Sequence, residues 1–587
     1  MKDNIKNLVS QAVATLQQQE QLPDDIQPNI IIENTRDPKH GDFACNIAMM
    51  LAKPAKRNPR ELAQLIIDHL PKNSQVTKME IAGPGFINFF LADDAYQTVI
   101  ADVLKQQQQF GHHPKQDKKY LIEFVSANPT GPLHVGHGRG AAYGDCIANL
   151  LATQGVTADR EYYVNDAGRQ MAILAASVWL RYLELQGAEF DFPVNGYKGE
   201  YIYDIAKALQ KTYNTQFVRD INTVFADVPA DEVKNDKGDV LSGDKEAHID
   251  GVIANAKQLL GDDYRVVFDT GLQDILSDIK QDLAEYRIEF DCWFSEKQLM
   301  DNGAIDHCID VLTKAGHMFE QEGALWFKAT AFGDEKDRVV KRANGQTTYF
   351  ASDIAYHLNK LERGYDVVVD VLGADHHGYV PRLKAGMQAM ANREDALTVP
   401  LVQFVSLYRG GKKVQMSTRS GSFITLRELR EEIGNDAARF FYVMRKIDQA
   451  MDFDLDLAKS KSNENPVYYI QYAHARVCSV LRQINDWSQD NGLQQLNCLT
   501  EVHEKDLCKR LAQYSELLSN AAFNYDPHLL ANYLRELAND FHSYYNHHQF
   551  LVDDVNIRDA RLCLITACKQ IFANGLQLLG VTAPDQM

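Results

Sequence analysis

The spacing of apolar positions predicts helices in the first part of the chain. One series recurs every three or four residues, as on the buried face of a helix: Ile5, Leu8, Val9, Ala12, Val13 and Leu16. Asn58 followed by Pro59 predicts a second helix start, because asparagine caps helices well and proline suits the first helical position. Gly83-Pro84-Gly85 predicts a turn before a strand over residues 86–90.

The middle of the chain alternates strand and helix patterns. Residues 120–125 and 366–372 are short apolar runs that predict buried strands, and residues 138–153 predict a helix. Such alternation predicts a parallel sheet with helices on both faces, where ligands bind beyond the carboxyl ends of the strands. Residues 190–300 are richer in charge and helix formers, so we expect an insertion there.

The last part of the chain is predicted to be helical throughout. Spacings of three and four recur over residues 468–481, 507–518, 529–545 and 559–579, which indicates a helical bundle. A polar stretch breaks the pattern near residue 110. We therefore expect three domains, at residues 1–110, 111–455 and 456–587.

Composition limits the function classes. The 587 residues are 45% apolar and 24% charged, which is typical of a soluble globular protein. A net charge of −19 argues against a generally basic nucleic-acid coat but permits a local basic face. Nine scattered cysteines without a Cys-x-x-Cys pair suit a reducing compartment and do not indicate a zinc site. With no secretory signal and no membrane-length apolar run, we expect a cytoplasmic protein without membrane contact.

The strongest chemical signal is the segment Asn128-Pro129-Thr130-Gly131-Pro132-Leu133-His134-Val135-Gly136-His137. Gly136 would let a phosphate approach the main chain, and the start of the following helix would offer free N–H groups. His134 and His137 can donate hydrogen bonds to an oxyanion at an α-phosphate. A turn with two histidines, or a metal site, is the alternative, although no third ligand is evident. The position between a strand and a helix favours nucleotide binding.

Residues 123–137 resemble the first signature of class I aminoacyl-tRNA synthetases, in the form found in bacterial arginyl-tRNA synthetases. The resemblance covers nearly the whole chain. Other matching segments lie at residues 36–43 and 83–88 (an amino-terminal domain that contacts the tRNA elbow), 290–296 (an insertion motif), 373–378 (the nucleotide-site loop), 469–476 (the start of the anticodon-binding bundle) and 580–587. The resemblance implies a Rossmann-like parallel-sheet catalytic domain, an α+β amino-terminal domain and an α-helical carboxyl-terminal bundle.

The resemblance also implies two small-molecule sites. The positions that match the arginine site are Glu123, Asn128, Tyr349, Asp353 and His377. Those that match the ATP site are Pro129, His134, Val135, Gly136, His137, Gly373, Asp375, Gln415, Met416, Ser417 and Arg419, with His134, Gly136 and His137 as the catalytic group. A guanidinium pairs with carboxylates through a rigid fork of donors, and we expect Asp353 to take it. Spacing leaves open which acid takes which cation, and Tyr349 and Asp353 taken alone fit the first turn of a helix.

The second signature of the family departs from its usual form here. It corresponds to residues 414–421, where Gln415 and Thr418 occupy the positions of the usual lysines. The cation that stabilises the leaving pyrophosphate is therefore open. Candidates are Arg419, Lys412 and Lys413, with Lys118 or Lys119 as an outside choice.

Two groups of residues could contact RNA. Lys53, Lys56, Arg57 and Arg60 form a basic run without an acid that could bind tRNA phosphates, or simply a solvated face. Tyr468, Tyr469, Tyr472, His474 and Arg476 combine aromatic and cationic groups that could stack on anticodon bases, with core packing as the alternative for Tyr472. The resemblance adds Met587 to the tRNA contacts.

The implied reaction is ATP-dependent ligation of L-arginine to its tRNA through an arginyl-adenylate, which releases AMP and pyrophosphate. Mg²⁺ is expected with ATP rather than in a protein cage, so no metal ligands are assigned. The family implies that adenylate formation waits for bound tRNA, and we expect a monomer. The alternatives are a smaller-molecule nucleotidylyltransferase, a non-enzymatic tRNA-binding relative, and a synthetase for another amino acid such as lysine or cysteine.

Overall fold

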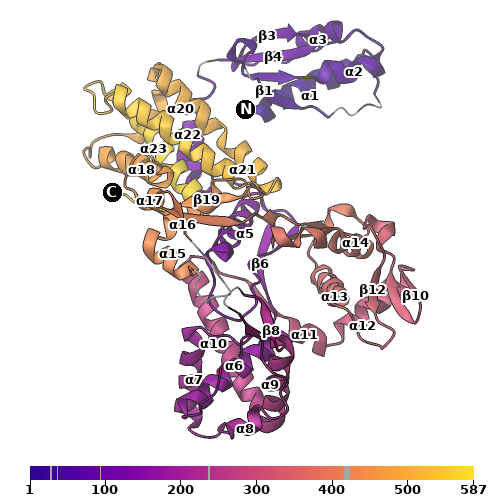
Figure 1. Ribbon diagram of the computed structural model, residues 1–587. Coiled ribbons are helices and arrows are strands. Elements are labelled where there is room, and N and C mark those ends of the chain that lie inside the picture. The colour runs from indigo at the N-terminus through magenta and orange to yellow at the C-terminus, as the bar shows by residue number, and fades with distance from the viewer. Residues whose placement is uncertain (25, 27–28, 36, 93, 236–237, 415–423) are drawn as a thin grey trace.

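The computed structural model describes residues 1–24, 26, 29–35, 37–92, 94–235, 238–414 and 424–587. In Figure 1 an amino-terminal domain lies at the top, above a helical carboxyl-terminal bundle and a central sheet region. Two further lobes extend from the centre, one downwards and one to the right. The amino-terminal domain has its own hydrophobic core, whereas one continuous core joins the central sheet, the lower helices and the bundle.

The amino-terminal domain contains an antiparallel sheet of order β1-β2-β4-β3. Its elements, with the helix that follows, are α1 (Lys2–Gln18), β1 (Ile32–Asn34), β2 (Phe43–Cys45), α2 (Ile47–Ala55), α3 (Pro59–Asp68), β3 (Val76–Ala82), β4 (Phe86–Leu91) and α4 (Thr98–Gln106). The predicted helix start is confirmed, because the Asn58 side chain accepts a hydrogen bond from the Arg60 N–H at 2.9 Å and Pro59 is the first helical residue. The predicted turn between β3 and β4 is confirmed as well.

The central sheet has five strands in the order β15-β13-β5-β6-β9, and all neighbouring pairs are parallel. Its strands and main helices are β5 (Lys119–Glu123), α5 (Val135–Thr153), β6 (Thr157–Val164), β9 (Cys292–Ser295), α13 (Tyr349–Glu362), β13 (Val367–Asp370), α14 (Val380–Ala391) and β15 (Leu397–Thr398). This confirms the predicted α/β class. Because the strands are parallel, the residues that follow β5, β6 and β13 meet at one edge of the sheet.

The two lobes are built from segments between sheet strands. The lower lobe, between β6 and β9, contains α6 (Arg169–Leu185), α7 (Glu200–Tyr213), α8 (Ile221–Val224), β7 (Val233–Lys234), β8 (Val240–Ser242), α9 (Lys245–Leu260) and α10 (Asp263–Glu285). The right-hand lobe combines α13 and α14 with α11 (Glu296–Asp301), α12 (Ala304–Lys314) and the antiparallel strands β10 (Met318–Gln321), β11 (Ala324–Phe327) and β12 (Arg338–Lys341).

Two short sheets, β14-β16 and β18-β17-β19, and several helices connect the central sheet to the bundle. They are β14 (Leu372–Gly373), β16 (Leu401–Val402), β17 (Val405–Arg409), β18 (Lys412–Lys413), α15 (Leu426–Ile433), α16 (Asn435–Val443), β19 (Met451–Asp454) and α17 (Leu455–Lys459). The bundle contains α18 (Pro466–Leu481), α19 (Gln489–Gln494), α20 (Val502–Ala512), α21 (Tyr514–Phe523), α22 (His528–His547) and α23 (Val555–Leu578). The predicted helical bundle is confirmed. The pattern over residues 507–518 spans two helices, α20 and α21, and Tyr514 at the start of α21 is buried against Phe110 and Tyr533.

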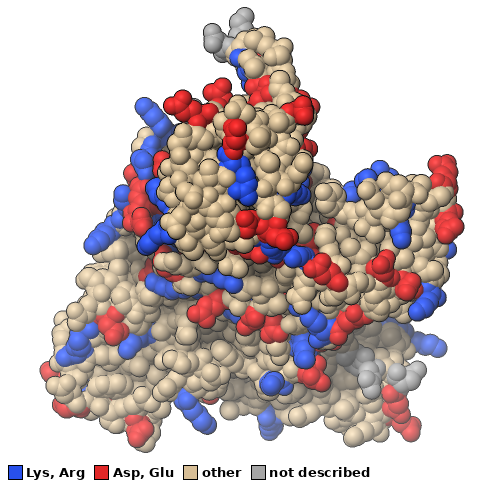
Figure 2. Space-filling model, turned by 90° about the horizontal axis from the view of Figure 1, so that it is seen from below, with Lys and Arg blue, Asp and Glu red and all other residues tan. Residues whose placement is uncertain are grey.

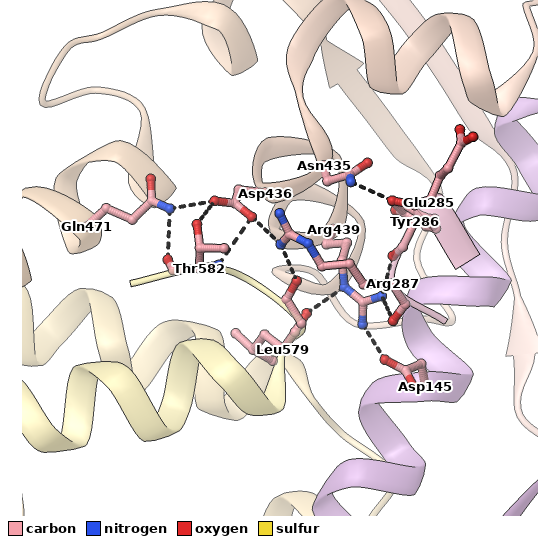
Figure 3. A network of polar contacts seen from close by, with 11 residues as sticks. Asp145, Glu285, Tyr286, Arg287, Asn435, Asp436, Arg439, Gln471, Leu579 and Thr582 are labelled. Carbon is pink, nitrogen blue, oxygen red and sulfur yellow. Dashed lines mark hydrogen bonds and ion pairs between the residues drawn. The ribbon is translucent and has the colours of Figure 1, made fainter. Parts of the chain in front are cut away.

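A buried arginine joins the sheet, the lower lobe and the bundle. Arg439 of α16 donates to the main-chain carbonyls of Leu579 (2.9 Å) and Tyr286 (3.0 Å) and pairs with Asp145 of α5. Figure 3 shows these contacts beside those of Asp436, which pairs with Arg287 at 2.6 Å and bonds to Thr582 and Gln471. We call this network the Arg439 junction.

The surface seen from below carries interspersed acidic and basic side chains (Figure 2). The excess negative charge is therefore not gathered into one patch on that face. Among the described helices, none is long and apolar enough to cross a membrane.

Candidate active site

The predicted histidine segment lies at the carboxyl edge of the sheet, directly after β5. Its two imidazoles form a reciprocal cap on α5: His134 Nδ1 accepts from the Gly136 N–H at 3.1 Å, and His137 Nδ1 accepts from the His134 N–H at 3.2 Å. The rings are stacked with centroids 3.6 Å apart. A Cβ on Gly136 would lie 2.9 Å from the His134 ring, so a side chain at this position would disturb the stack.

Both imidazoles are neutral donors in this arrangement. Because each Nδ1 accepts a main-chain N–H, the ring proton is on Nε2. Burial lowers the pKa of His134, and burial together with the neighbouring His134 lowers the pKa of His137 to about 3. Both side chains are partly exposed, so the segment is not sealed inside the protein.

The prediction of free N–H groups at the start of α5 was wrong for this conformation. The Val135 N–H donates to the Ile424 carbonyl at 3.2 Å, the Gly136 N–H donates to the His134 ring, and the His137 N–H donates to the His134 carbonyl at 2.9 Å. The histidine side chains take the place of solvent or an anion as caps. Any anion-binding role of this segment therefore depends first on the imidazole Nε2–H groups.

The backbone between β5 and the histidines is strained. Val125 and Ser126 both have positive φ angles, +66° and +40°, which is rare for residues with side chains and especially for a β-branched one. Ser126 Oγ donates to Glu123 Oε1 at 3.0 Å and accepts from the Tyr163 N–H at 3.0 Å. These contacts hold the turn that leads to Asn128.

The other predicted ATP-site residues occupy different surroundings. Pro129 and Val135 are buried, Gly373 is part of β14, and Asp375 is exposed in the turn that follows. Gln415, Met416, Ser417 and Arg419 lie outside the described residues. The segment that follows them is close to the histidines, because Ile424 bonds to Val135 and Leu426 N–H donates to the Leu133 carbonyl at 2.8 Å.

The described candidates for the cation that stabilises pyrophosphate lie in two different places in the structure. Lys412 and Lys413 are exposed on β18. Lys118 and Lys119 lie at the start of β5, at the opposite end of that strand from Glu123. Lys118 and Lys119 are therefore separated from the carboxyl edge of the sheet by the length of β5, which is roughly 15 Å.

Three carboxylates gather near the carboxyl edge around one phenol. Glu296, Asp353 and Glu123 all raise the pKa of Tyr163, after the larger effect of its burial. Tyr379 donates a hydrogen bond to Asp353, and burial raises the pKa of the Asp353 carboxyl. Asp353 lies in the second turn of α13 rather than in the first, so the favourable interaction of an acid with the first turn does not explain it. We call Glu123, Glu296 and Asp353 the acid cluster.

Sequence reasoning missed Glu296 as a site residue. It is the first residue of α11, its residue surface is 8% exposed, and burial raises its pKa, with Asp166 and Asp353 contributing. The amide of Asn165 donates to Glu296 Oε2 at 2.6 Å and also contacts Asn128. Two signals in the sequence pointed to Glu296: it ends the matching segment 290–296, and it directly follows a strand of the sheet.

The remaining predicted arginine contacts face solvent. Asn128 is exposed and donates to Gln170 at 2.7 Å, and His377 is exposed in the turn after β14. The Tyr349 side chain is 84% exposed at the start of α13, one helical turn before Asp353 on the same face.

Glu123 differs from the other two acids because it has a cationic partner. Its Oε2 lies 2.5 Å from the ammonium of Lys360, which also lies 2.8 Å from Asp370. The Lys360 side chain is fully buried. Burial alone would lower the pKa of Lys360, but the charges of Asp370 and Glu123 outweigh it and raise the pKa.

The candidate RNA contacts form two surface groups. Lys53, Lys56, Arg57 and Arg60 are all exposed at the end of α2 and the start of α3. In the bundle, the Arg476 guanidinium lies 4.4 Å from the centroid of the half-buried Tyr472 ring and 4.5 Å from that of Tyr545, and Tyr472 stacks on Tyr468. Met587 is 51% exposed. Tyr472 is thus part of a partly exposed aromatic and cationic surface rather than of the core.

One group of side chains among the described residues has metal-ligand spacing. The ligand atoms of His474, Cys478 and Asp585 lie within 4.8 Å of one another in the bundle. Each already has a protein partner, since His474 Nδ1 bonds to the Pro584 carbonyl at 2.9 Å and the Cys478 thiol donates to Asp585 at 3.2 Å. Within the described part of the chain, no such group lies at the histidine segment.

Known domain families cover nearly the whole chain. Residues 3–91 match the arginyl tRNA synthetase N terminal domain, residues 99–455 the class I (R) tRNA synthetase catalytic domain, and residues 470–587 the DALR anticodon binding domain. The chain is 57% identical to an arginine–tRNA ligase of Thioalkalivibrio sulfidiphilus and 56% identical to one of Hydrogenovibrio crunogenus, each over 100% of both chains. A solved Thermus thermophilus arginyl-tRNA synthetase shares the fold, with a TM-score of 0.74 and 21% identity over 100% of both chains.

Proposed function

The chain belongs to the arginyl-tRNA synthetase family of class I aminoacyl-tRNA synthetases, and we propose that the carboxyl edge of its central sheet ligates L-arginine to tRNA at the expense of ATP. The observation that carries the proposal is the combination of two neutral imidazole donors with an acid cluster at the same sheet edge. The first group suits a phosphate, and the second suits a cationic amino acid.

The first step is attack of the arginine carboxylate on the α-phosphate of ATP, which gives arginyl-adenylate and pyrophosphate. Negative charge develops on the α-phosphate oxygens, and the Nε2–H groups of His134 and His137 are the donors that stabilise it. No general base is needed, because the attacking carboxylate is already ionised. Mg²⁺ enters with ATP and neutralises phosphate charge.

The guanidinium of the substrate is placed between Asp353 and Glu296. Among the described residues, the hydrogen bonds given to these carboxylates come from the neutral groups Tyr379, Tyr163 and Asn165, and neither forms an ion pair. A planar cation with five donors satisfies two such acids. Glu123 provides negative charge for the α-ammonium group, and Asn128, Tyr349 and His377 complete the arginine site.

In the second step the terminal ribose hydroxyl of tRNA attacks the carbonyl carbon of the arginyl-adenylate. An ester bond forms between arginine and the tRNA, and AMP leaves. The exposed basic group of Lys53, Lys56, Arg57 and Arg60 suits tRNA phosphates, and Tyr472, Arg476 and Met587 suit the anticodon loop. Gly373, Asp375, Gln415, Met416, Ser417 and Arg419 are assigned to ATP. We expect a cytoplasmic monomer in which bound tRNA is required for adenylate formation.

A charging assay with a panel of amino acids and total tRNA tests this function. The expected result is acid-precipitable arginine only, dependent on ATP and Mg²⁺, with pyrophosphate exchange that requires tRNA. Charging with lysine or cysteine would contradict the substrate. Pyrophosphate exchange with a substrate that is not an amino acid would indicate a nucleotidylyltransferase, and tight tRNA binding without charging would indicate a binding protein.

A further inference from the structure

A fully buried ammonium lies behind the acid cluster. Lys360 of α13 contacts Glu123 of β5 at 2.5 Å and Asp370 of β13 at 2.8 Å, and its Nζ lies 4.2 Å from the centroid of the Tyr356 ring. The Lys360 side chain is 0% exposed. It therefore has no path to a substrate, and its positive charge would repel arginine if it had one.

Lys360 lies between two buried carboxylates, and a histidine contacts one of them. His357 Nε2 lies 2.7 Å from Asp370 Oδ2, and its Nδ1 lies 2.7 Å from the Asp353 main-chain carbonyl. Asp370 is thus contacted by both Lys360 and His357, whereas Lys360 is the cation that pairs with Glu123.

Glu123 transmits this arrangement to the substrate side. Its other oxygen, Oε1, accepts from Ser126, whose Oγ accepts the Tyr163 N–H. Ser126 is one of the two strained residues of the turn that leads to Asn128. The Lys360 contact therefore fixes one oxygen of a carboxylate whose other oxygen holds the strained turn.

We propose that Lys360 is a positioning residue of the arginine site, which holds the Glu123 carboxylate in place without touching substrate. This inference rests on the proposed function. It differs from a general stabilising role, for which the end of the same helix offers a comparison. Arg363, which directly follows the last residue of α13, pairs with the buried Glu161 at 2.5 Å, and no described side-chain hydrogen bond links that pair to Val125 or Ser126.

The titration of Glu123 depends on groups from three elements. Lys360 of α13, Asp370 of β13 and Glu161 of β6 act on it directly. His357 acts on Asp370, and Tyr356 and Arg363 act on Glu161. Burial and the carboxylates of Asp370 and Glu161 raise the pKa of Glu123, and Lys360 is the group that opposes them. Loss of Lys360 would therefore raise the pKa of Glu123 further.

The test compares Lys360→Met, Lys360→Arg and the control Arg363→Met in the full chain. We expect Lys360→Met to raise the KM for arginine about 10- to 100-fold at neutral pH, because a charged hydrogen bond to the substrate is lost. The KM for ATP should stay within about twofold of the wild-type value. The arginine KM of Lys360→Met should fall as the pH is raised, because a higher pH favours the ionised form of Glu123. Lys360→Arg should restore most of the wild-type KM and pH profile.

The control separates positioning from stability. Arg363→Met should lower the melting temperature while leaving the arginine KM and its pH profile unchanged. If Lys360→Met does not fold, the double variant Lys360→Met/Asp370→Asn removes one positive and one negative charge together, so it keeps the net charge of the group while leaving Glu123 without its cation. Its arginine KM should remain raised under the proposal.

Three outcomes would overturn the inference: a wild-type arginine KM in a folded variant that lacks Lys360, a pH profile that Lys360→Met does not change, or an equal rise in arginine KM in Arg363→Met. Failure of the proposed function is distinguishable, because the wild-type chain would then not charge arginine at all.

Discussion

Two buried cations in this molecule, Arg439 and Lys360, contact different kinds of partner. At the Arg439 junction, the guanidinium donates to the main-chain carbonyls of Leu579 and Tyr286 as well as to Asp145. Behind the acid cluster, the Lys360 ammonium contacts the carboxylates of Glu123 and Asp370. The first network ties backbone segments from three parts of the chain together, whereas the second fixes the charge and position of side chains.

The comparison teaches that burial of charge alone does not identify a functional group. A guanidinium has a rigid fork that suits several fixed backbone acceptors, and an ammonium is a compact charge that suits carboxylates. The partners decide the role. Changes at the junction should therefore affect stability first, and changes at the acid cluster should affect the substrate first.

The sharpest test of this division is Asp353→Asn. The substitution keeps the shape of the side chain but removes the charge for the guanidinium, so we expect kcat/KM for arginine to fall roughly 10³-fold or more. The melting temperature should change little. The matched control is Glu362→Gln, an exposed acid in the last turn of the same helix that pairs with His307; equal losses in both variants would contradict the assignment.

At the junction, Arg439→Met should reduce the free energy of unfolding by about 3 kcal/mol or more, because it leaves the buried Asp145 without one of its cations. Urea denaturation measures this change. The KM values for arginine and ATP of the folded fraction should stay near those of the wild type. Arg287→Met, which removes a half-exposed pair with Asp436, should cost less than about 1 kcal/mol; a change in arginine KM in either variant would break the comparison.

His134→Ala tests the phosphate side of the site. Removal of one oxyanion donor is expected to lower the rate of adenylate formation by about 10²–10³-fold. Single-turnover measurements with saturating arginine, ATP and tRNA give this rate. Because His134 also caps α5, His134→Asn is the control: asparagine keeps a cap acceptor, so its melting temperature should stay near that of the wild type while its rate stays low. An unchanged rate in both variants would remove the histidines from the mechanism.

The smallest expected effect is a pH dependence of arginine binding. Burial raises the pKa of both Asp353 and Glu296, so these acids take up protons at a higher pH than exposed acids do. The protonated forms bind a guanidinium poorly, so the KM for arginine should rise as the pH is lowered, by about threefold to tenfold for each unit over which these acids take up protons. Glu296→Gln should weaken this dependence and raise the KM at pH 7.5. A steeper pH profile in Glu296→Gln would contradict the placement of the guanidinium.

The sequence predicted the features that depend on local pattern. The parallel sheet, the Asn58 cap, the turn between β3 and β4 and the position of His134 and His137 before a helix follow from apolar spacing and turn chemistry. The features that it did not predict depend on contacts between distant segments. Glu296 joins Asp353 only through the order of strands in the sheet, and Lys360 reaches Glu123 across 237 residues.

The error about the start of α5 has a physical cause. Its N–H groups donate to the His134 ring, the His134 carbonyl and the Ile424 carbonyl. Here a side chain and a distant main-chain carbonyl take N–H groups that the pattern alone leaves free. Such competition is decided by tertiary contacts, which a single sequence does not show.

The strained pair Val125 and Ser126 has a consequence for protein engineering. A valine at a φ of +66° costs conformational energy that glycine would not. Directed evolution for heat resistance alone would thus favour glycine at position 125. Glycine would also loosen the loop that carries Asn128 and the two histidines, so a library screened for turnover should keep valine there. Which residue survives each screen would reveal what the rigidity of this loop contributes to fitness.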